Sequence, residues 1–137
     1  MKAGTNLEKV LASGRFAVTA EAGPPKGASA AVMVRKAEIL RHCCDGANVT
    51  DNQTAIVRMS SLAGCLLLRQ QGVDPVMQIV CQDRNRIAIQ SDVLGAVALG
   101  IGNILCLSGD HQKFGNHPTA KSVFDIDSIQ LIQTLKK

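Results

Sequence analysis

The stretch from residue 103 to residue 111 reads Asn103-Ile104-Leu105-Cys106-Leu107-Ser108-Gly109-Asp110-His111. An apolar run stops abruptly there at small and acidic residues. This pattern predicts a buried β-strand followed by a loop that carries chemistry. Three upstream segments end in a similar way, so the predicted strands begin near residues 16, 47, 76 and 103. A spacing of about 30 residues is the length of one strand–loop–helix unit.

The segments between these strands have helical spacing of their apolar residues. We expect strands at 16–20, 47–49, 76–80 and 103–107, and helices at 29–42, 57–71 and 87–99. A short helix at about 6–12 precedes the first strand. A last helix begins at Asp125 or Asp127 and includes Leu135.

Repeated strand–helix units imply an α/β fold with a parallel sheet and right-handed crossovers. An open doubly wound sheet and part of a (βα)₈ TIM-type barrel both fit. A whole barrel needs roughly 250 residues. Four units in 137 residues make half of one, so we expect a truncated chain or a half that needs a partner.

The composition excludes several classes of function. Apolar residues make up 46% of the chain and aromatic residues only 2%, which argues against the stacking platforms of single-strand nucleic-acid binders. A net charge of +4 with scattered basic residues does not predict a DNA-binding surface. The start lacks an apolar signal core, and no apolar run is long enough to span a bilayer, so we expect a cytoplasmic protein. The five cysteines form no C-x-x-C pair, which favours buried thiols in a reducing compartment.

Polar residues follow each predicted strand. They are Glu21, then residues 50–52, residues 82–83 and residues 108–111. Loops after parallel strands converge on one face, so these groups are expected at one mouth, with Gln78 pointing inward from its strand. Three of the aspartates have a simpler interpretation as solvated loop residues or helix caps: Asp51, Asp83 and Asp125.

Glu21 and Asp110 are the stronger functional candidates because each directly ends a strand. A carboxyl group held beside the rigid Pro24-Pro25 loop can serve as a general acid. Gly109 allows close approach of a flat ligand, and Asp110 could accept hydrogen bonds from a heterocycle. His111 and His117 give only a weak zinc signal, and we predict no metal site. Neither a dinucleotide nor a P-loop fingerprint is present.

Three motifs together resemble the methylenetetrahydrofolate reductase family. They are residues 19–27, Thr-Ala-Glu-Ala-Gly-Pro-Pro-Lys-Gly; residues 48–53, Asn-Val-Thr-Asp-Asn-Gln; and residues 105–111, Leu-Cys-Leu-Ser-Gly-Asp-His. The likeness is closest to short bacterial and archaeal forms, some of which act in acetogenic pathways, and it covers nearly the whole chain.

The resemblance implies a cytoplasmic one-carbon enzyme, in methionine biosynthesis or acetogenesis, with non-covalent FAD at the carboxyl ends of a (βα)₈ barrel. NAD(P)H or another donor would reduce the flavin, which would reduce 5,10-methylenetetrahydrofolate to 5-methyltetrahydrofolate. Residues 1–137 would form the N-terminal half of this barrel, completed by an oligomer or a partner subunit. Neither nucleic acid nor membrane is expected as a partner.

The resemblance also implies roles for single residues. Glu21 matches the general acid that opens the folate's five-membered ring, and Asp110 matches the acidic residue beside flavin and pterin. The remaining cofactor-contacting positions would be Thr50, Gln78, Ser108, Gly109, Phe124 and Asp125.

Some positions depart from the family pattern. Ser108 stands where better-known bacterial members have arginine, Gln78 stands where many have histidine, and Ala22-Gly23 replaces an aromatic pair. Two alternatives stay open: a non-catalytic half-barrel fragment or subunit that needs a partner, and a pterin-binding methyltransferase-like barrel.

Overall fold

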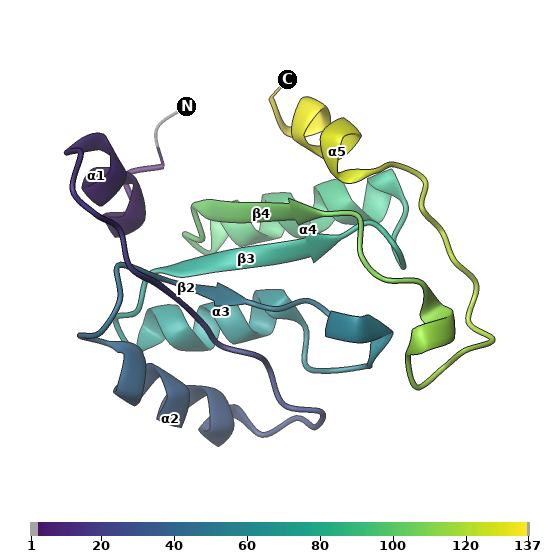
Figure 1. Cartoon of the computed structure of the whole chain (residues 1–137), viewed down its shortest axis with the longest axis horizontal. Coiled ribbons are helices and arrows are strands. Elements are labelled where there is room, and N and C mark those ends of the chain that lie inside the picture. Colours follow the sequence, from purple (N-terminus) through teal and green to yellow (C-terminus); the bar gives the residue numbers. More distant parts are fainter. Residues whose placement is uncertain (1–2, 137) are drawn as a thin grey trace.

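Four apolar segments form one parallel sheet in the computed structural model, which describes residues 3–136 (Figure 1). The strand order follows the chain, and the bounds are β1 (Thr19–Glu21), β2 (Gly46–Val49), β3 (Pro75–Val80) and β4 (Asn103–Leu107). Each strand therefore pairs with the next one along the chain, always in parallel. Such a steady progression is the strand order of a (βα)₈ barrel, and the sheet has the α/β architecture of half of one.

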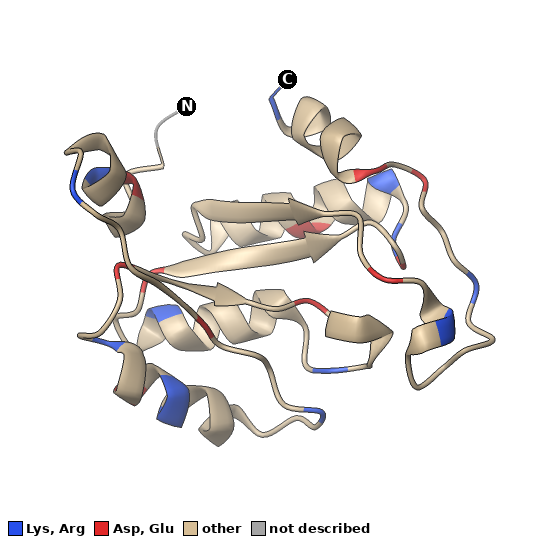
Figure 2. Cartoon of the chain, viewed as in Figure 1, with Lys and Arg blue, Asp and Glu red and all other residues tan. Residues whose placement is uncertain are grey.

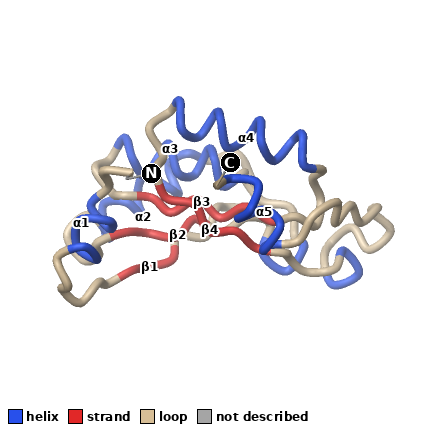
Figure 3. Tube along the Cα trace, turned by 90° about the horizontal axis from the view of Figure 1, so that it is seen from above, coloured by secondary structure: helices blue, strands red, loops and turns tan. Residues whose placement is uncertain are grey.

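Three helices follow the first three strands and lie along the same face of the sheet (Figure 3). They are α2 (Ala30–Leu40), α3 (Ser61–Gln70) and α4 (Arg86–Ala98). An open doubly wound sheet would carry helices on both faces. The remaining elements are α1 (Asn6–Ala12), α5 (Ser128–Leu135), and the short 3₁₀ helices η1 (Gln53–Ala55) and η2 (Gln112–Phe114). No helix within residues 3–136 is long and apolar enough to cross a bilayer.

The core lies between the sheet and these helices because side chains alternate along each strand. Val49, Met77 and Ile79 point to the helical side and are almost fully buried. They pack in one cluster with the helix side chains Met33, Leu68 and Ile89. Asn48, Gln78 and Leu105 point to the opposite face, which is less buried. That second face corresponds to the interior of a barrel.

Two elements begin at least three residues later than predicted. The first strand begins at Thr19, and Phe16 is 90% exposed. The backbone N–H of Val18 donates to the Asp45 carboxylate rather than to a strand. The helix predicted from residue 57 begins at Ser61, because the Ser60 side chain accepts a hydrogen bond from Ala63 N and caps it.

Helix α1 lies at the amino ends of the strands (Figure 1). Its Leu7 N–H donates to the Asp74 carboxylate at 3.0 Å, and the hydroxyl of its cap Thr5 donates to Asn103 Oδ1 at 2.8 Å. This helix therefore covers part of the end opposite the polar loops. The carboxyl ends remain available for a site.

Candidate functional site

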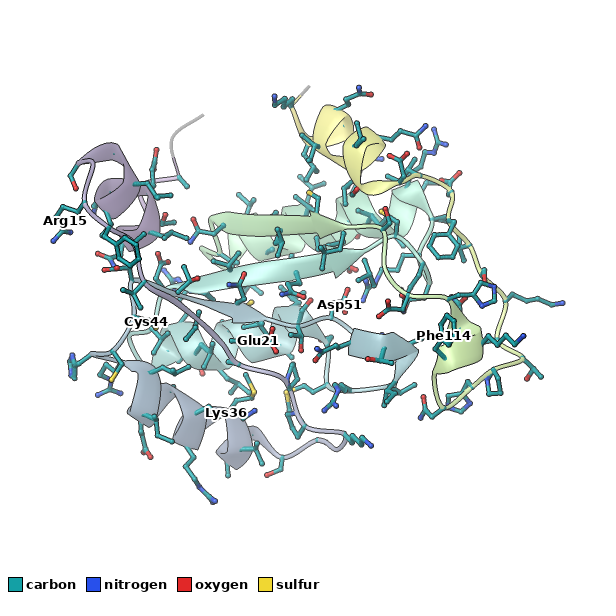
Figure 4. All side chains as sticks on the ribbon, viewed as in Figure 1. Arg15, Glu21, Lys36, Cys44, Asp51 and Phe114 are labelled. Carbon is teal, nitrogen blue, oxygen red and sulfur yellow. The ribbon has the colours of Figure 1, made fainter. Side chains whose placement is uncertain are left out.

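A cavity of about 250 Å³ lies at the carboxyl ends of the strands, where the predicted polar loops converge. In Figure 4, Glu21 and Asp51 lie toward this end, whereas Cys44 lies toward the other. Figure 2 marks acidic segments in the loops that follow β2 and β4. The lining residues are Glu21, Thr50, Asp51, Asn52, Gln53, Gln78, Val80, Gln82, Leu107, Ser108, Gly109 and Asp110.

Glu21 is the last residue of β1 and contributes an exposed carboxyl group to the cavity. In the register of the sheet it pairs with Asn48 of β2, and the N–H of the following Ala22 donates to Asn48 O at 2.7 Å. Within residues 3–136, no hydrogen bond or ion pair engages the Glu21 carboxylate. This group is therefore free to meet a ligand.

Thr50 and Gln78 lie deeper in the cavity. Extending the β2–β3 register places Thr50 beside Gln78, which in turn pairs with Leu105. Thr50 is 2% exposed, and its Oγ1 has no hydrogen-bond partner in the described part of the chain. A buried hydroxyl without a partner is costly, so a ligand that bonds to it would stabilise the site.

Asp51 also lines the cavity, but its carboxylate is fully engaged. It accepts from Val80 N at 3.1 Å and from both terminal nitrogens of Arg84, at 2.6 and 3.1 Å. Burial alone would lower the pKa of Arg84, yet hydrogen bonds and charge from Asp51, with further charge from Asp83 and Asp92, raise it above its ordinary value. Asp51 is therefore the buried half of an ion pair with the partly buried Arg84, rather than a solvated loop residue.

Asp110 holds a strained segment of the loop after β2. Its carboxylate accepts from Thr54 N at 3.0 Å. Asn52, Thr54 and Ala55 all have φ between +41° and +59°, which is the left-handed region that non-glycine residues rarely occupy. The cavity rim is therefore held by a carboxylate that the sequence predicts to be functional.

Ser108 and Gly109 form the wall nearest β4. The Ser108 hydroxyl accepts from Ser128 N at 3.2 Å and so ties this wall to the start of α5. Gly109 has φ +94°, and a Cβ there would come within 2.9 Å of Gln82 Cδ. Only glycine fits this backbone against the Gln82 side chain.

We predict that Gly109→Ala lowers stability by about 1–2 kcal/mol, because alanine is strained at this φ. The displaced Gln82 side chain would also narrow the cavity, so ligand affinity should fall. Thermal unfolding and a binding titration measure the two effects. The control is Gly95→Ala in α4, where a Cβ meets nothing within 4 Å. Equal changes in stability and ligand affinity in Gly109→Ala and Gly95→Ala would contradict this account.

Phe124 and Asp125 do not line the cavity. Phe124 has φ +39° and is 39% exposed. The Asp125 carboxylate accepts from Arg86 Nε at 2.8 Å, Nη2 at 3.0 Å and the backbone N at 2.9 Å. Arg86 is therefore a structural partner of Asp125, and this pair joins the last loop to the start of α4.

The Asp125–Arg86 pair predicts an acid-dependent contribution to stability. Hydrogen bonds from Arg86 lower the pKa of Asp125 from 3.8 to about 2. Because the pKa is lower in the folded state, the contribution is present above about pH 4 and disappears as pH falls through 2. The unfolding temperatures of the native protein and Asp125→Asn should differ at pH 5 and converge toward pH 2. A difference independent of pH would contradict the assignment.

The cysteines within the fold do not offer a nucleophile. All five are free thiols. Burial, with the nearby charge of Asp51, raises the pKa of Cys65 to about 12, and burial also raises the pKa of Cys81 and Cys106. The buried thiols therefore stay protonated near neutral pH.

The two candidate histidines have different surroundings in the structure. His111 caps η2 by accepting from Lys113 N, and His117 lines a neighbouring apolar cavity.

Sequence reasoning left several wall residues without a role. Val80 follows Gln78 at the two-residue period of a strand, and this alternation is the signal that could have identified it. Gln82 was expected at the mouth, but sequence reasoning assigned it no role. The side chain of Gln82 is buried against Gly109, and its backbone oxygen accepts from Gln112 Nε2 and Val123 N. Gln82 thus joins the cavity wall to the long loop after β4.

Comparison with known proteins identifies the family of this chain. Residues 6–137 match the family model described as methylenetetrahydrofolate reductase. The comparison with curated proteins gave no match. The family match includes all three motifs and every residue of the cavity. The chain belongs to the methylenetetrahydrofolate reductase family.

Proposed function

We propose that this chain takes part in the flavin-dependent reduction of 5,10-methylenetetrahydrofolate to 5-methyltetrahydrofolate. The family match supports a role in folate metabolism. The observation that carries the finer assignment is the composition of the cavity. The unpaired carboxyl group of Glu21 and the rim carboxyl group of Asp110 line it together with several side-chain amides and the buried Thr50 hydroxyl.

Glu21 is the proposed general acid. Opening the five-membered ring of the folate requires a proton on the departing nitrogen, and a carboxyl group without a competing partner is suited to deliver it. Asp110 stands on the opposite wall, after β4. Pterins carry N–H groups, and Asp110 can accept hydrogen bonds from them while retaining the Thr54 contact.

The residues of the cavity fit a flavin ring. FAD would supply the hydride when bound. Thr50 offers an unpaired hydroxyl, and Gln78 offers a side-chain amide that can both donate and accept. Gly109 lets a flat ring approach the backbone, with Ser108 beside it. The volume of about 250 Å³ is smaller than the roughly 300–1,000 Å³ of most ligand pockets, so it suits one flat heterocycle rather than a whole dinucleotide.

The two edges of the sheet support a larger assembly. Among residues 3–136, both β1 and β4 pair on one side only, which leaves strand edges that can pair further. We propose that residues 1–137 act as the N-terminal half of a barrel, joined by further strands or a partner subunit.

The free thiols suit the reducing cytoplasm.

FAD binding tests the cofactor assignment. The protein is titrated with FAD, and flavin fluorescence and absorbance are followed. We expect saturable quenching and a perturbed flavin spectrum, weakened by Gly109→Ala. A flavin spectrum unchanged by the protein would contradict flavin binding by this chain and favour the non-catalytic alternative.

A further inference from the structure

We propose that Arg84 is a positioning residue that neutralises the buried Asp51 carboxylate and thereby keeps the cavity wall in place. Arg84 does not line the cavity. It reaches the wall mainly through the Asp51 carboxylate, at 2.6 and 3.1 Å, and also donates a longer hydrogen bond to Val80 O at 3.5 Å. Arg84 follows β3 and Asp51 follows β2, so the pair links two loops that are separate in the chain.

The geometry leaves Asp51 unable to bind a ligand itself. The Asp51 side chain is 0% exposed, one oxygen accepts from Val80 N and Arg84 Nη1, and the other accepts from Arg84 Nη2. Its neighbours are the groups that face the cavity. Thr50 precedes it with the unpaired hydroxyl, and Asn52 follows it with φ +41°. Fixing Asp51 therefore contributes to the position of both, together with the hydrogen bonds that Asn52 donates to Asp83 and accepts from Arg58 N.

The Asp51–Arg84 pair also affects the charge of the cavity. The lining residues include three carboxylates, those of Glu21, Asp51 and Asp110, and no lysine or arginine. Arg84 neutralises one of the three at short range. Its other carboxylate neighbours are Asp92 at 3.3 Å and Asp83 at 3.7 Å. Without Arg84, the negative charge of Asp51 would face an electron-rich ligand across the cavity.

Stability alone does not explain such a pair. A buried ion pair contributes about as much as apolar residues of equal size, and removing one partner leaves a costly unpaired charge. If Arg84 acts by neutralising Asp51, then removing both charges should be less harmful than removing Arg84 alone. If the pair were only a structural link, the double variant would be at least as impaired.

The experiment compares Arg84→Met, Asp51→Asn, the double variant, and the conservative Arg84→Lys. Amide resonances of Thr50, Asn52 and Gln82 in ¹H–¹⁵N spectra report the wall without any ligand, and Lys9 in α1 serves as reference. We expect Arg84→Met to shift the wall resonances, the double variant to return them toward the native positions, and Arg84→Lys to lie between. Wall resonances that stay in place in Arg84→Met, or that the double variant fails to restore, would overturn the inference.

A pH series keeps the test usable if Arg84→Met is unstable. An unpaired buried carboxylate favours its neutral form, so the unfolding temperature of Arg84→Met should fall as pH rises from 4 to 8 relative to native protein. The double variant, which lacks that carboxylate, should not show this fall. Parallel curves for the two variants would contradict charge coupling between Arg84 and Asp51.

The ligand readout uses FAD and rests on the proposed function. We expect the FAD dissociation constant to rise about tenfold or more in Arg84→Met and to recover most of that loss in the double variant. If native protein binds no FAD, the flavin assignment fails, while the amide spectra and the pH series still decide the role of Arg84. If native protein binds FAD and the double variant shows no recovery, the role of Arg84 fails alone.

Discussion

Glu21→Gln should slow the reduction of methylenetetrahydrofolate by about 10²–10⁴-fold, the usual contribution of a positioned general acid. Glutamine has nearly the same shape but cannot deliver a proton to the folate nitrogen. The reduction of the flavin by its donor needs no such proton transfer and should keep its native rate. Rapid-mixing measurements of the two half-reactions, made separately, test this split.

Glu38→Gln is the matched control. Glu38 is an exposed residue of α2, away from the cavity, so its variant should reduce folate at the native rate. Equal loss of both half-reactions in Glu21→Gln would indicate damage to flavin binding. That result would count against Glu21 as the acid, even if overall turnover disappeared.

Leu68→Ala should lower the free energy of unfolding by about 2–5 kcal/mol, the range for truncating a fully buried leucine. Leu68 lies in α3, is 0% exposed, and belongs to the cluster that contains Met33 and Met77. Its removal leaves a cavity between α3 and the sheet. Chemical denaturation monitored by circular dichroism gives the free energy directly.

Leu94→Ala gives the matching control in α4, where Leu94 is 72% exposed. Its effect should stay within about 0.5 kcal/mol. A loss of similar size in both variants would show that the apolar layer between sheet and helices is not where the stability resides.

The repeating units of the fold could be predicted because each strand carries its own signal. The stretch from residue 103 to residue 107 forms β4 with the predicted bounds. Glu21 and Asp110 were predicted at one mouth and line one cavity, because parallel strands direct their carboxyl ends to the same edge. The first strand was predicted too long, since Phe16 and Val18 are apolar but have no neighbouring strand to pair with.

Pairings between distant loops could not be predicted. Arg84 and Asp51 lie 33 positions apart, and Arg86 and Asp125 lie 39 apart. Nothing in either local pattern selects one arginine for one aspartate. The strained backbone from Asn52 to Ala55 is likewise fixed by contacts, among them the Asp110 carboxylate, rather than by glycine residues.

The most direct test of the proposed function is the anaerobic reoxidation of the reduced flavin by methylenetetrahydrofolate. The protein is loaded with FAD, bleached with a chemical reductant, and mixed with the folate. We predict that flavin absorbance returns and that 5-methyltetrahydrofolate forms in equal amount. A flavin that binds but stays bleached in the presence of the folate would contradict the assignment of this cavity to folate reduction.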